Sequence, residues 1–531
     1  MSLLAIKDLS VQIGQAEILH GINLSVQAGE IVAITGESGS GKSMTALATM
    51  GLLPRGAQTQ GTVMLDGIDI LTTPEPALCQ MRGNSMGMVF QEPMTALNPV
   101  QTIGAQVAET LLVHRNMPRR EAHRQAAEVL QRVGLTVPPD RYPHELSGGQ
   151  RQRVVIAMAI ALRPKLLIAD EPTTALDVTT QARILALLRE LVSAFDMGLL
   201  IITHDLAVVA DIADRIVVMQ KGRVVEAAPT QTLLAEMRHP YTKSLFAAST
   251  HQVDLPDRAP AAPLLRVANV DRDYPMPREK LLGPRPRFRA LHDISFEVEH
   301  GERVGLVGES GCGKSTLTRA ILGLEDVQGG QIMLDGQPVF TGRHPNLTVR
   351  RKMQVVFQDP YSSFNPRHRV DRLITEPFHL LERPPTGPAR DAAITKALAD
   401  VGLSPSDGRK YIHEFSGGQR QRIAIARALI VEPELIIFDE AVSALDVSVR
   451  AQVLDLIADL CRKRPLGYLF ISHDLSVVRT VTDRVLVMQA GRIVEQGPTE
   501  DVFNNPQHPY TKSLIAAAPQ LPDITHAPET V

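Results

Sequence analysis

Two nearly identical glycine-rich segments carry the residues of this chain that are best suited to phosphate chemistry. They read GESGSGKS at 36–43 and GESGCGKS at 308–315. Both fit G-x-x-x-x-G-K-[ST], a P-loop whose backbone N–H groups curl around phosphates while Lys42 or Lys314 supplies positive charge. A helix that begins at such a loop also points its positive end at the anion. The residues expected to contact the nucleotide are Gly36, Ser38, Gly39, Ser40, Gly41, Lys42, Ser43, Met44, Gly308, Ser310, Gly311, Cys312, Gly313, Lys314, Ser315 and Thr316.

Two acidic pairs could supply the metal ligand and the base that such a site needs. Asp170–Glu171 ends the apolar run LLIADE, and Asp439–Glu440 ends LIIFDE. In P-loop enzymes an aspartate at this place holds Mg²⁺, usually through water. The neighbouring glutamate can take a proton from attacking water. We therefore expect Glu171 and Glu440 to be catalytic, and Asp170 and Asp439 to be metal ligands. The P-loop hydroxyls of Ser43 and Ser315 are the further expected metal ligands.

A third repeated motif, SGGQ, leads into an apolar helical segment in each half of the chain. Its residues are Ser147 to Gly149 in the first copy and Ser416 to Gly418 in the second. A serine followed by glycines at a helix start is typical of a helix N-cap, and it is equally suited to a second anion-binding helix end. The residues alone leave both interpretations open.

The motifs repeat at a nearly constant interval. The SGGQ, acidic, histidine (ITHDL, ISHDL) and HPYTKSL segments are each 269 residues apart, and the P-loops are 308 − 36 = 272 apart. This spacing is far above that of solenoid repeats and indicates a duplicated domain. We expect domains at 1–250 and 264–531, joined by a Pro-rich linker at 251–263. A basic, Pro-rich segment at 275–290, which we interpret as a solvated loop, lengthens the second copy.

Short apolar runs must position these loops. The runs before each P-loop, each acidic pair and each histidine are typical of strands in a mostly parallel sheet buried on both faces. The polar stretches 101–135 and 367–403 have helical spacing and predict a helical insert between P-loop and acidic strand. Each half is therefore expected to be α/β, with a mixed β core and a helical subdomain.

Composition excludes several other classes. The chain has 531 residues, 44% of them apolar, and a formal net charge of −3, so nothing in the charge balance favours nucleic-acid binding. Its three cysteines are far apart and form no CxxC motif, which favours a reduced, cytosolic protein. Apolar runs fall well short of the roughly 18 residues of a membrane span, and the start of the chain lacks the pattern of a signal peptide.

In chain order, the motifs of each half resemble those of an ABC ATPase domain. The first set is GESGSGKS, Gln91 in MVFQEP, LSGGQ, LLIADEP, ALD at 175–177 and His204; the second is GESGCGKS, Gln358 in VVFQDP, FSGGQ, LIIFDEA, ALD at 444–446 and His473. FQEPMTALNP, FQDPYSSFNP and HPYTKSL are similar to the wording of ATPase subunits in the oligopeptide/dipeptide/nickel import family. The fused double form resembles ATPases of glutathione and microcin C/peptide importers.

This resemblance implies roles for further residues. Gln91 and Gln358 would contact Mg²⁺ and water beside the membrane subunit, and His204 and His473 would hold the γ-phosphate of ATP. The SGGQ turn of one half, through Ser147 and Gly149 or Ser416 and Gly418, would cap the ATP held by the other half. The implied partners are two membrane permease subunits and, indirectly, an extracytoplasmic solute-binding protein. The protein would be peripheral, on the cytoplasmic face of the inner membrane.

Four residues depart from the pattern or modify it. Tyr274 is placed to stack on adenine in the second half, whereas Ile13 stands in its place in the first. Met44 replaces the threonine present as Thr316, and Ala441 replaces the proline of LLIADEP. Cys312 lies beside a lysine and a helix start, both of which lower a thiol pKa, and we therefore expect a reactive thiol.

Two other classes remain as alternatives. Soluble tandem ABC proteins that act on ribosomes also have two halves, but their linker is a long charged helical hairpin, unlike the short Pro-rich linker here. An exporter ATPase would share all the hydrolytic motifs, and the HPYTKSL segments favour an importer instead. The sequence does not identify the solute.

Overall fold

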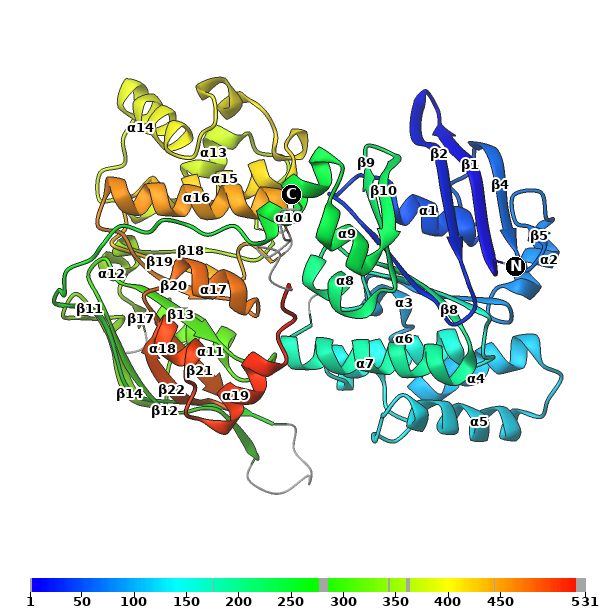
Figure 1. The fold of residues 1–531 in the computed structure, drawn as a ribbon. Coiled ribbons are helices and arrows are strands. Elements are labelled where there is room, and N and C mark those ends of the chain that lie inside the picture. Colours follow the sequence, from blue (N-terminus) through cyan, green and yellow to red (C-terminus); the bar gives the residue numbers. More distant parts are fainter. Residues whose placement is uncertain are drawn as a thin grey trace, which may run out of the picture.

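The computed structural model describes residues 2–174, 176–276, 285–341, 344–359, 363–443 and 445–521. The two halves lie side by side, the first on the right and the second on the left in Figure 1. Parts of four predicted segments lie outside the described residues: Ala175 and Ala444 of the ALD motifs, 277–284 of the basic loop, and 360–362 of FQDPYSSFNP. The division into domains at 250 and 264 stays a prediction, although 251–262 form neither helix nor strand.

The first half contains an antiparallel sheet and a larger mixed sheet. The four-stranded sheet has the order β2-β1-β4-β5, and the six-stranded sheet β10-β9-β3-β8-β7-β6, parallel except for β10. The strands are β1 (Leu4–Ile13), β2 (Ala16–Val26), β3 (Ile31–Thr35), β4 (Ala57–Leu65), β5 (Ile68–Asp69), β6 (Met86–Val89), β7 (Leu166–Asp170), β8 (Gly198–Ile202), β9 (Arg215–Gln220) and β10 (Arg223–Pro229).

The second half repeats both sheets. Their orders are β12-β11-β14-β15 and β18-β19-β20-β13-β21-β22, and a two-stranded ribbon β16-β17 is added. The strands are β11 (Pro263–Pro275), β12 (Arg287–Glu299), β13 (Arg303–Val307), β14 (Gly329–Leu334), β15 (Gln337–Pro338), β16 (Phe340–Thr341), β17 (His344–Pro345), β18 (Met353–Val356), β19 (Leu435–Asp439), β20 (Gly467–Ile471), β21 (Arg484–Gln489) and β22 (Arg492–Pro498).

The mixed sheet is buried on both faces, as the apolar runs predict. In β3, Ile31 and Ala33 pack with the helical insert, whereas Val32 and Ile34 pack with the antiparallel sheet and the helix after the P-loop. The carboxyl ends of β3, β8, β7 and β6, which are neighbours in the sheet, therefore open on the same edge. The P-loop, the histidine, the acidic pair and the glutamine follow these four strands, and this edge is where ligands bind in parallel sheets.

Helices cover the mixed sheets and connect their strands. In the first half they are α1 (Lys42–Thr49), α2 (Glu75–Met81), α3 (Pro93–Ala96), α4 (Ile103–His114), α5 (Arg119–Arg132), η1 (Pro143–Glu145), α6 (Gly148–Ile160), α7 (Val178–Phe195), α8 (Leu206–Ile212), α9 (Thr230–Glu236) and α10 (Pro240–Ser249). In the second half they are α11 (Lys314–Ile321), α12 (Leu347–Lys352), α13 (Val370–Ile374), η2 (Glu376–Leu380), α14 (Gly387–Asp400), η3 (Pro405–Arg409), η4 (Ile412–Glu414), α15 (Gly417–Leu429), α16 (Val447–Lys463), α17 (Leu475–Val481), α18 (Thr499–Asn504) and α19 (Pro509–Ala516).

The predicted helical inserts are present in both halves but differ in regularity. In the first half α4 and α5 pack as a pair of full helices. In the second half the first helix is cut short after Ile374 and continues as the 3₁₀ turn η2, in which Pro377 lies. Proline lacks the N–H of a helical hydrogen bond and clashes with the preceding turn, which explains the interruption. Within the described residues, no helix is long and apolar enough to cross a membrane.

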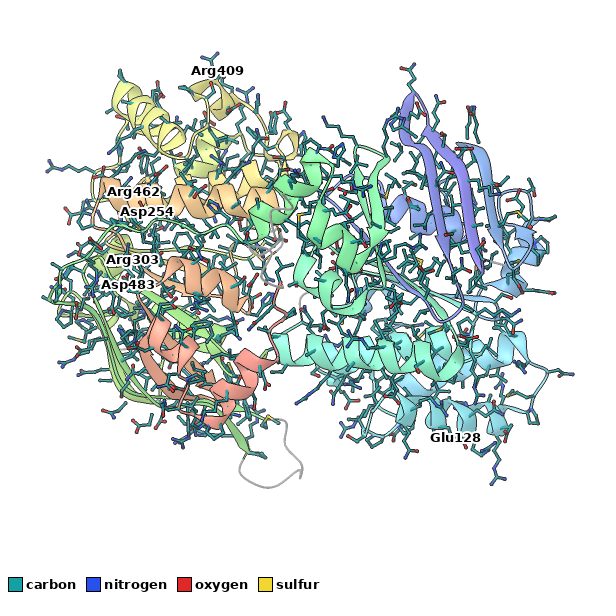
Figure 2. The ribbon with its side chains drawn as sticks, in the orientation of Figure 1. Glu128, Asp254, Arg303, Arg409, Arg462 and Asp483 are labelled. Carbon is teal, nitrogen blue, oxygen red and sulfur yellow. The ribbon has the colours of Figure 1, made fainter. Side chains whose placement is uncertain are left out.

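The halves hold each other through their C-terminal helices. Helix α10 of the first half packs on α16 of the second, and α19 packs on α7 (Figure 1). The linker is also attached to α16, where Arg462 donates a 2.5 Å hydrogen bond to the carbonyl oxygen of Asp254 (Figure 2). A second contact joins His251 Nε2 and Asp455 Oδ1 at 2.7 Å. The linker is therefore not a free tether between two independent domains.

Candidate ATP-hydrolysing sites

Each P-loop wraps around its own lysine. The ammonium group of Lys42 donates hydrogen bonds to the carbonyl oxygens of Gly36 and Glu37, both at 2.8 Å. Lys314 makes the matching pair of bonds at 2.7 and 2.9 Å. Both lysines are buried, so their charge is directed into the loop and not into solvent. This arrangement places a cation inside each predicted phosphate cradle.

The first glycine of each P-loop is required by a close backbone approach. Gly36 has φ +147°, and a Cβ added there would lie 2.1 Å from the carbonyl oxygen of Met219. Gly308 repeats this geometry, with φ +153° and 2.1 Å to the carbonyl oxygen of Met488. No side chain fits at this position, so only glycine allows the loop to turn tightly from the strand toward the helix.

The first acidic pair gathers the predicted catalytic side chains around one carboxylate. Glu171 accepts a 2.7 Å hydrogen bond from Gln91 Nε2 and a 2.9 Å bond from Thr174 Oγ1. His204 Nδ1 lies 3.2 Å from its other oxygen. These residues follow three neighbouring strands, β6, β7 and β8, so the common sheet edge brings them together as expected.

The second acidic pair has the same layout with longer contacts. His473 Nδ1 is 3.5 Å from Glu440 Oε2. Gln358 Nε2 is 3.5 Å from the hydroxyl of Ser443, which itself donates to the backbone oxygen of Glu440. Glu171 and Glu440 both adopt a left-handed backbone, with φ of 48° and 50°. Among the described residues, the glutamine therefore contacts the predicted catalytic glutamate directly in the first half only.

Burial and neighbouring charges separate the two acids of each pair. Burial raises the pKa of Asp170 and of Asp439, and the adjacent glutamate charge raises it further. Burial is the largest influence on the pKa of Glu171 and Glu440 and acts to raise it, but the hydrogen bond and charge of His204 or His473, together with the charge of the P-loop lysine, give a lowered pKa in both. Each glutamate is therefore held as a carboxylate, the form that a general base requires.

The residues around Asp170 fit a magnesium ion. Its Oδ1 is buried and has no hydrogen-bond partner among the described residues. The Ser43 hydroxyl hydrogen-bonds Asp170, and Gln91 follows β6, the strand next to β7. Oxygen ligands of this kind are those that Mg²⁺ prefers. Within the described residues, no cluster of three or more His, Cys, Asp or Glu side chains could hold a metal. A metal at this edge would therefore depend on the hydroxyl and amide ligands as well.

The SGGQ turns are helix N-caps, so the first of the two interpretations left open by the sequence is confirmed. Ser147 Oγ accepts from the Gln150 backbone, and Gln150 Oε1 accepts in return from the Ser147 backbone at 2.9 Å. The second glycine is required by close packing, since a Cβ on Gly149 would lie 2.2 Å from Thr180 of α7. Gly418 meets Val449 of α16 at the same distance. The capping role does not exclude the anion-binding role, because Ser147 and Ser416 remain exposed.

The start of the helix after each acidic strand, α7 or α16, reaches across to the P-loop of the opposite half. Thr179 of the first half donates a 2.6 Å hydrogen bond to Glu309 of the second P-loop. Asp177 accepts from the Ser310 backbone at 3.3 Å. In the other direction, Ser448 donates to Glu37 of the first P-loop at 2.7 Å. Because α6 packs on α7 through Gly149, the first SGGQ turn is connected to the second P-loop.

The sequence motifs do not identify these bridging residues. Glu37 and Glu309 hold the variable second position of the P-loop pattern, and Thr179 and Ser448 lie just after the ALD motifs. A usable signal was present, because the pair ES follows the first glycine in both loops and a hydroxyl residue follows both ALD motifs at the same spacing. The pattern itself assigns no chemistry to either position.

The predicted adenine side of the two sites differs in more than one residue. The Tyr274 hydroxyl donates to Glu325 and lies 3.4 Å from Thr316, and Arg272 lies over the Tyr274 ring at 4.7 Å. The positions equivalent to Arg272, Tyr274, Thr316 and Glu325 are Val11, Ile13, Met44 and Leu53, which belong to or pack against one apolar cluster. The departures at Ile13 and Met44 are thus parts of one exchange, of a polar network for an apolar cluster.

The expectation of a reactive thiol at Cys312 is wrong. Cys312 is buried, at 6% exposure, and burial raises the pKa of its thiol more than the nearby Lys314 lowers it. The sequence shows the lysine and the helix start but not the desolvation, which dominates. Cys312 still lies in the P-loop, as does its counterpart Ser40.

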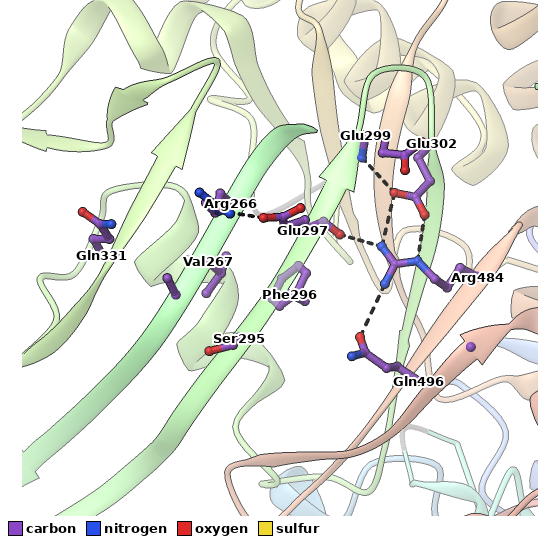
Figure 3. Close-up of a pocket in the computed structure, with 12 residues that line it drawn as sticks. Arg266, Val267, Ser295, Phe296, Glu297, Glu299, Glu302, Gln331, Arg484 and Gln496 are labelled. Atoms are coloured by element: carbon purple, nitrogen blue, oxygen red, sulfur yellow. Dashed lines mark hydrogen bonds and ion pairs between the residues drawn. The ribbon is translucent and has the colours of Figure 1, made fainter. Parts of the chain in front are cut away.

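A pocket of about 660 Å³ lies away from these sites (Figure 3). Arg484 crosses it with hydrogen bonds to Glu302 at 2.7 Å and to the Glu297 carbonyl oxygen at 2.5 Å. Arg215 and Glu30 form the equivalent pair in the first half at 2.9 Å. These paired charges join the antiparallel sheet to the mixed sheet, and we interpret the pocket as structural.

Two P-loop ATPase cassettes joined in one chain are the class of protein that this fold and these sites define. Residues 19–174 and 291–443 match the ABC transporter family, and residues 225–263 and 494–529 match the C-terminal region of oligopeptide/dipeptide transporters. The chain therefore belongs to the ABC transporter family, as an ATP-binding protein of the tandem type.

Full-length relatives share this organisation. The peptidoglycan transport ATP-binding protein YejF of Agrobacterium fabrum is 45% identical over 526 residues, which cover 97% of this chain and 96% of the relative. The glutathione import ATP-binding protein GsiA of Escherichia coli O157:H7 is 44% identical over 575 residues, with coverage of 100% and 92%. The predicted fold class and the predicted family are confirmed.

Proposed function

We propose that the chain powers import of peptides or a related small solute, such as glutathione, across the inner membrane. The observation that carries this proposal is the match to the oligopeptide/dipeptide transporter C-terminal region in both halves. Relatives named for peptidoglycan and glutathione transport support it, because each is similar over nearly its full length. The two relatives differ in solute, so the solute class is proposed and a particular solute is not.

In this proposal, each site hydrolyses ATP with a carboxylate base. Glu171 orients and deprotonates the attacking water, and His204, which lies 3.2 Å from it, contacts the γ-phosphate. Lys42 would hold the β- and γ-phosphates, and Asp170, Ser43 and Gln91 would hold Mg²⁺, which would neutralise charge on the phosphates. Glu440, His473, Lys314, Asp439, Ser315 and Gln358 have the same roles in the second site.

We propose that two permease subunits dock beside the glutamines. A groove of about 660 Å³ borders Gln358 and Phe357 in the second half and is also lined by Glu376, His379 and Leu380 of the helical insert. In the first half Phe90, Met94 and Val100, which flank Gln91, are exposed at 42%, 50% and 80%. Exposed apolar patches mark contact sites for other proteins, and these side chains supply apolar surface near Gln91. Docking there would link the permease to the residue that contacts Glu171.

Reconstitution tests the proposal. The chain would be purified with two candidate permeases encoded near it, and placed in proteoliposomes with a solute-binding protein. We expect ATP hydrolysis and uptake of a labelled peptide or glutathione to depend on the binding protein. The control is Glu171→Gln with Glu440→Gln, which should bind ATP and lose both activities. Hydrolysis without uptake of any peptide or glutathione, or wild-type turnover in the double variant, would contradict the proposal.

A further inference from the structure

The repeated HPYTKSL segment forms a capped helix start that contacts the P-loop. In the first copy, His239 Nδ1 accepts a 3.2 Å hydrogen bond from the Tyr241 backbone and so caps α10. Pro240 is the first helical residue, where a proline is favoured because its missing N–H is not needed. The His239 backbone is itself held by Glu226 at 3.1 Å. Tyr241 is thereby fixed at the second position of the helix.

Both tyrosines of this segment bind the P-loop of their own half. The hydroxyl of Tyr241 accepts a 3.0 Å hydrogen bond from the backbone N–H of Glu37. The hydroxyl of Tyr510 accepts the equivalent bond from Glu309 at 2.9 Å. Both rings are buried, at 8% exposure. The same contact forms in both halves, each time between residues about 200 positions apart, so it is a feature of the duplicated fold.

The same two glutamates carry the contacts between the halves. A side-chain oxygen of Glu37 accepts a hydrogen bond from Ser448, and one of Glu309 accepts a hydrogen bond from Thr179. The helices that present the tyrosines continue this pattern, because α10 packs on α16 and α19 packs on α7. Ser448 and Thr179 lie in the first turn of those same two helices. Each tyrosine thus belongs to a cluster of its own P-loop and the opposite half.

We propose that Tyr241 and Tyr510 are positioning residues of the two ATP sites. Each hydroxyl holds the P-loop glutamate of its own half in the position where it accepts the hydroxyl of the opposite half. The C-terminal segment of each domain thereby couples the shape of the phosphate cradle to closure of the two halves. The proposal rests on the proposed ATP hydrolysis and adds to it a role for HPYTKSL that the hydrolytic motifs do not supply.

The chemistry of the cluster suits a fixed contact. Burial raises the pKa of Tyr241 to about 12, and the charges of Glu37 and Asp446 also raise it. Burial likewise raises the pKa of Tyr510 well above its usual value. Both hydroxyls therefore stay protonated at neutral pH. Removal of either would leave a partly buried backbone N–H of the P-loop without its acceptor, which is costlier than the loss of an exposed hydrogen bond.

Amide exchange on the full chain tests the contact without relying on activity. Tyr510→Phe should speed hydrogen–deuterium exchange of the Glu309 amide about two- to tenfold, the range for one lost hydrogen bond, and leave the Glu37 amide unchanged. Tyr241→Phe should do the reverse, so each variant is the matched control of the other. Unchanged exchange in a variant's own loop, or equal changes in both loops, would overturn the proposal.

A double-mutant cycle tests the coupling across halves. We expect Tyr510→Phe and Thr179→Val each to lower the ATPase rate about fivefold, on the scale of one hydrogen bond. Because both act through Glu309, the double variant should lose about as much as the worse single variant. Tyr241→Phe with Thr179→Val is the control, and its losses should multiply. Multiplying losses in the first pair would overturn the coupling. A wild-type chain without ATPase activity would contradict the proposed function instead, and the exchange data would still decide this inference.

Discussion

At the scale of residues, the two predicted ATP sites differ by a concerted exchange and not by isolated substitutions. The polar group of Tyr274, Thr316 and Glu325 is replaced in the first half by residues that pack against an apolar cluster. From the sequence, single positions such as Ile13 could be identified as departures from the family pattern. Their common cause could not, because Leu53 and Glu325 belong to no motif and their proximity depends on how β1 and β11 lie against the P-loop helices.

The exchange predicts unequal nucleotide binding. Tyr274→Ala should weaken ATP binding more than Ile13→Ala, since loss of aromatic stacking costs on the order of 1–3 kcal/mol. The chain has no tryptophan, so Tyr274→Trp and Ile13→Trp each introduce a single tryptophan whose emission can be followed selectively. We expect MgATP to quench the fluorophore at 274 the more strongly. Calorimetry on the two alanine variants gives the affinities, and equal losses would contradict stacking at Tyr274.

The raised pKa of Cys312 predicts an unreactive P-loop thiol. At pH 7 a maleimide should label the exposed Cys79 well before the buried Cys312, because only thiolate reacts and burial keeps Cys312 protonated. Peptide mass mapping over time measures both rates. Cys312→Ser should leave the effect of maleimide on the ATPase rate unchanged. Faster labelling of Cys312 than of Cys79, slowed by ATP, would show that the thiol is reactive after all.

At the scale of elements, the SGGQ helix can pack closely on the helix after the acidic strand because its second residue is a glycine with no side chain. Gly149 lets α6 approach Thr180 of α7, and Gly418 lets α15 approach Val449 of α16. The sequence predicted the strands and both helical inserts, because their apolar spacing is strong. It left the second glycine of SGGQ unexplained, since the partner helix begins about 30 residues later and only the tertiary packing brings it close.

This packing predicts opposite tolerance at two adjacent glycines. Gly418→Ala should destabilise the protein by about 1–3 kcal/mol, the usual cost of overpacking, because the new Cβ would lie 2.2 Å from Val449 Cγ1. Gly417→Ala is the matched control, since a Cβ there meets nothing within 4 Å. Thermal unfolding measures both variants. Adding Val449→Ala should restore the melting temperature of Gly418→Ala. Equal melting temperatures for the two single variants would contradict the packing account.

At the scale of the whole molecule, each predicted ATP site has contacts from both halves. Thr179 and Asp177 contact the second P-loop, and Ser448 contacts the first, so each half completes the other. The crossed arrangement was expected from the family resemblance of the SGGQ turns. The residues that carry the contacts were not expected, because a side chain that bridges two halves follows no local spacing. The linker contacts of Asp254 and His251 with α16 were equally beyond a sequence reading.

The central claim is that each ATP site is shared, and cross-linking tests it most directly. In a chain with Cys79, Cys312 and Cys461 replaced by serine, Ser147→Cys would be paired with Ser310→Cys or with Ser38→Cys, and treated with a short bis-maleimide in the presence of MgATP. Mass spectrometry would identify the linked peptides. The shared-site account predicts a cross-link between positions 147 and 310, little between 147 and 38, and the mirrored result for Ser416→Cys, which should link to position 38. A cross-link between 147 and 38 in place of 147 and 310 would contradict the account and show that each half caps its own nucleotide.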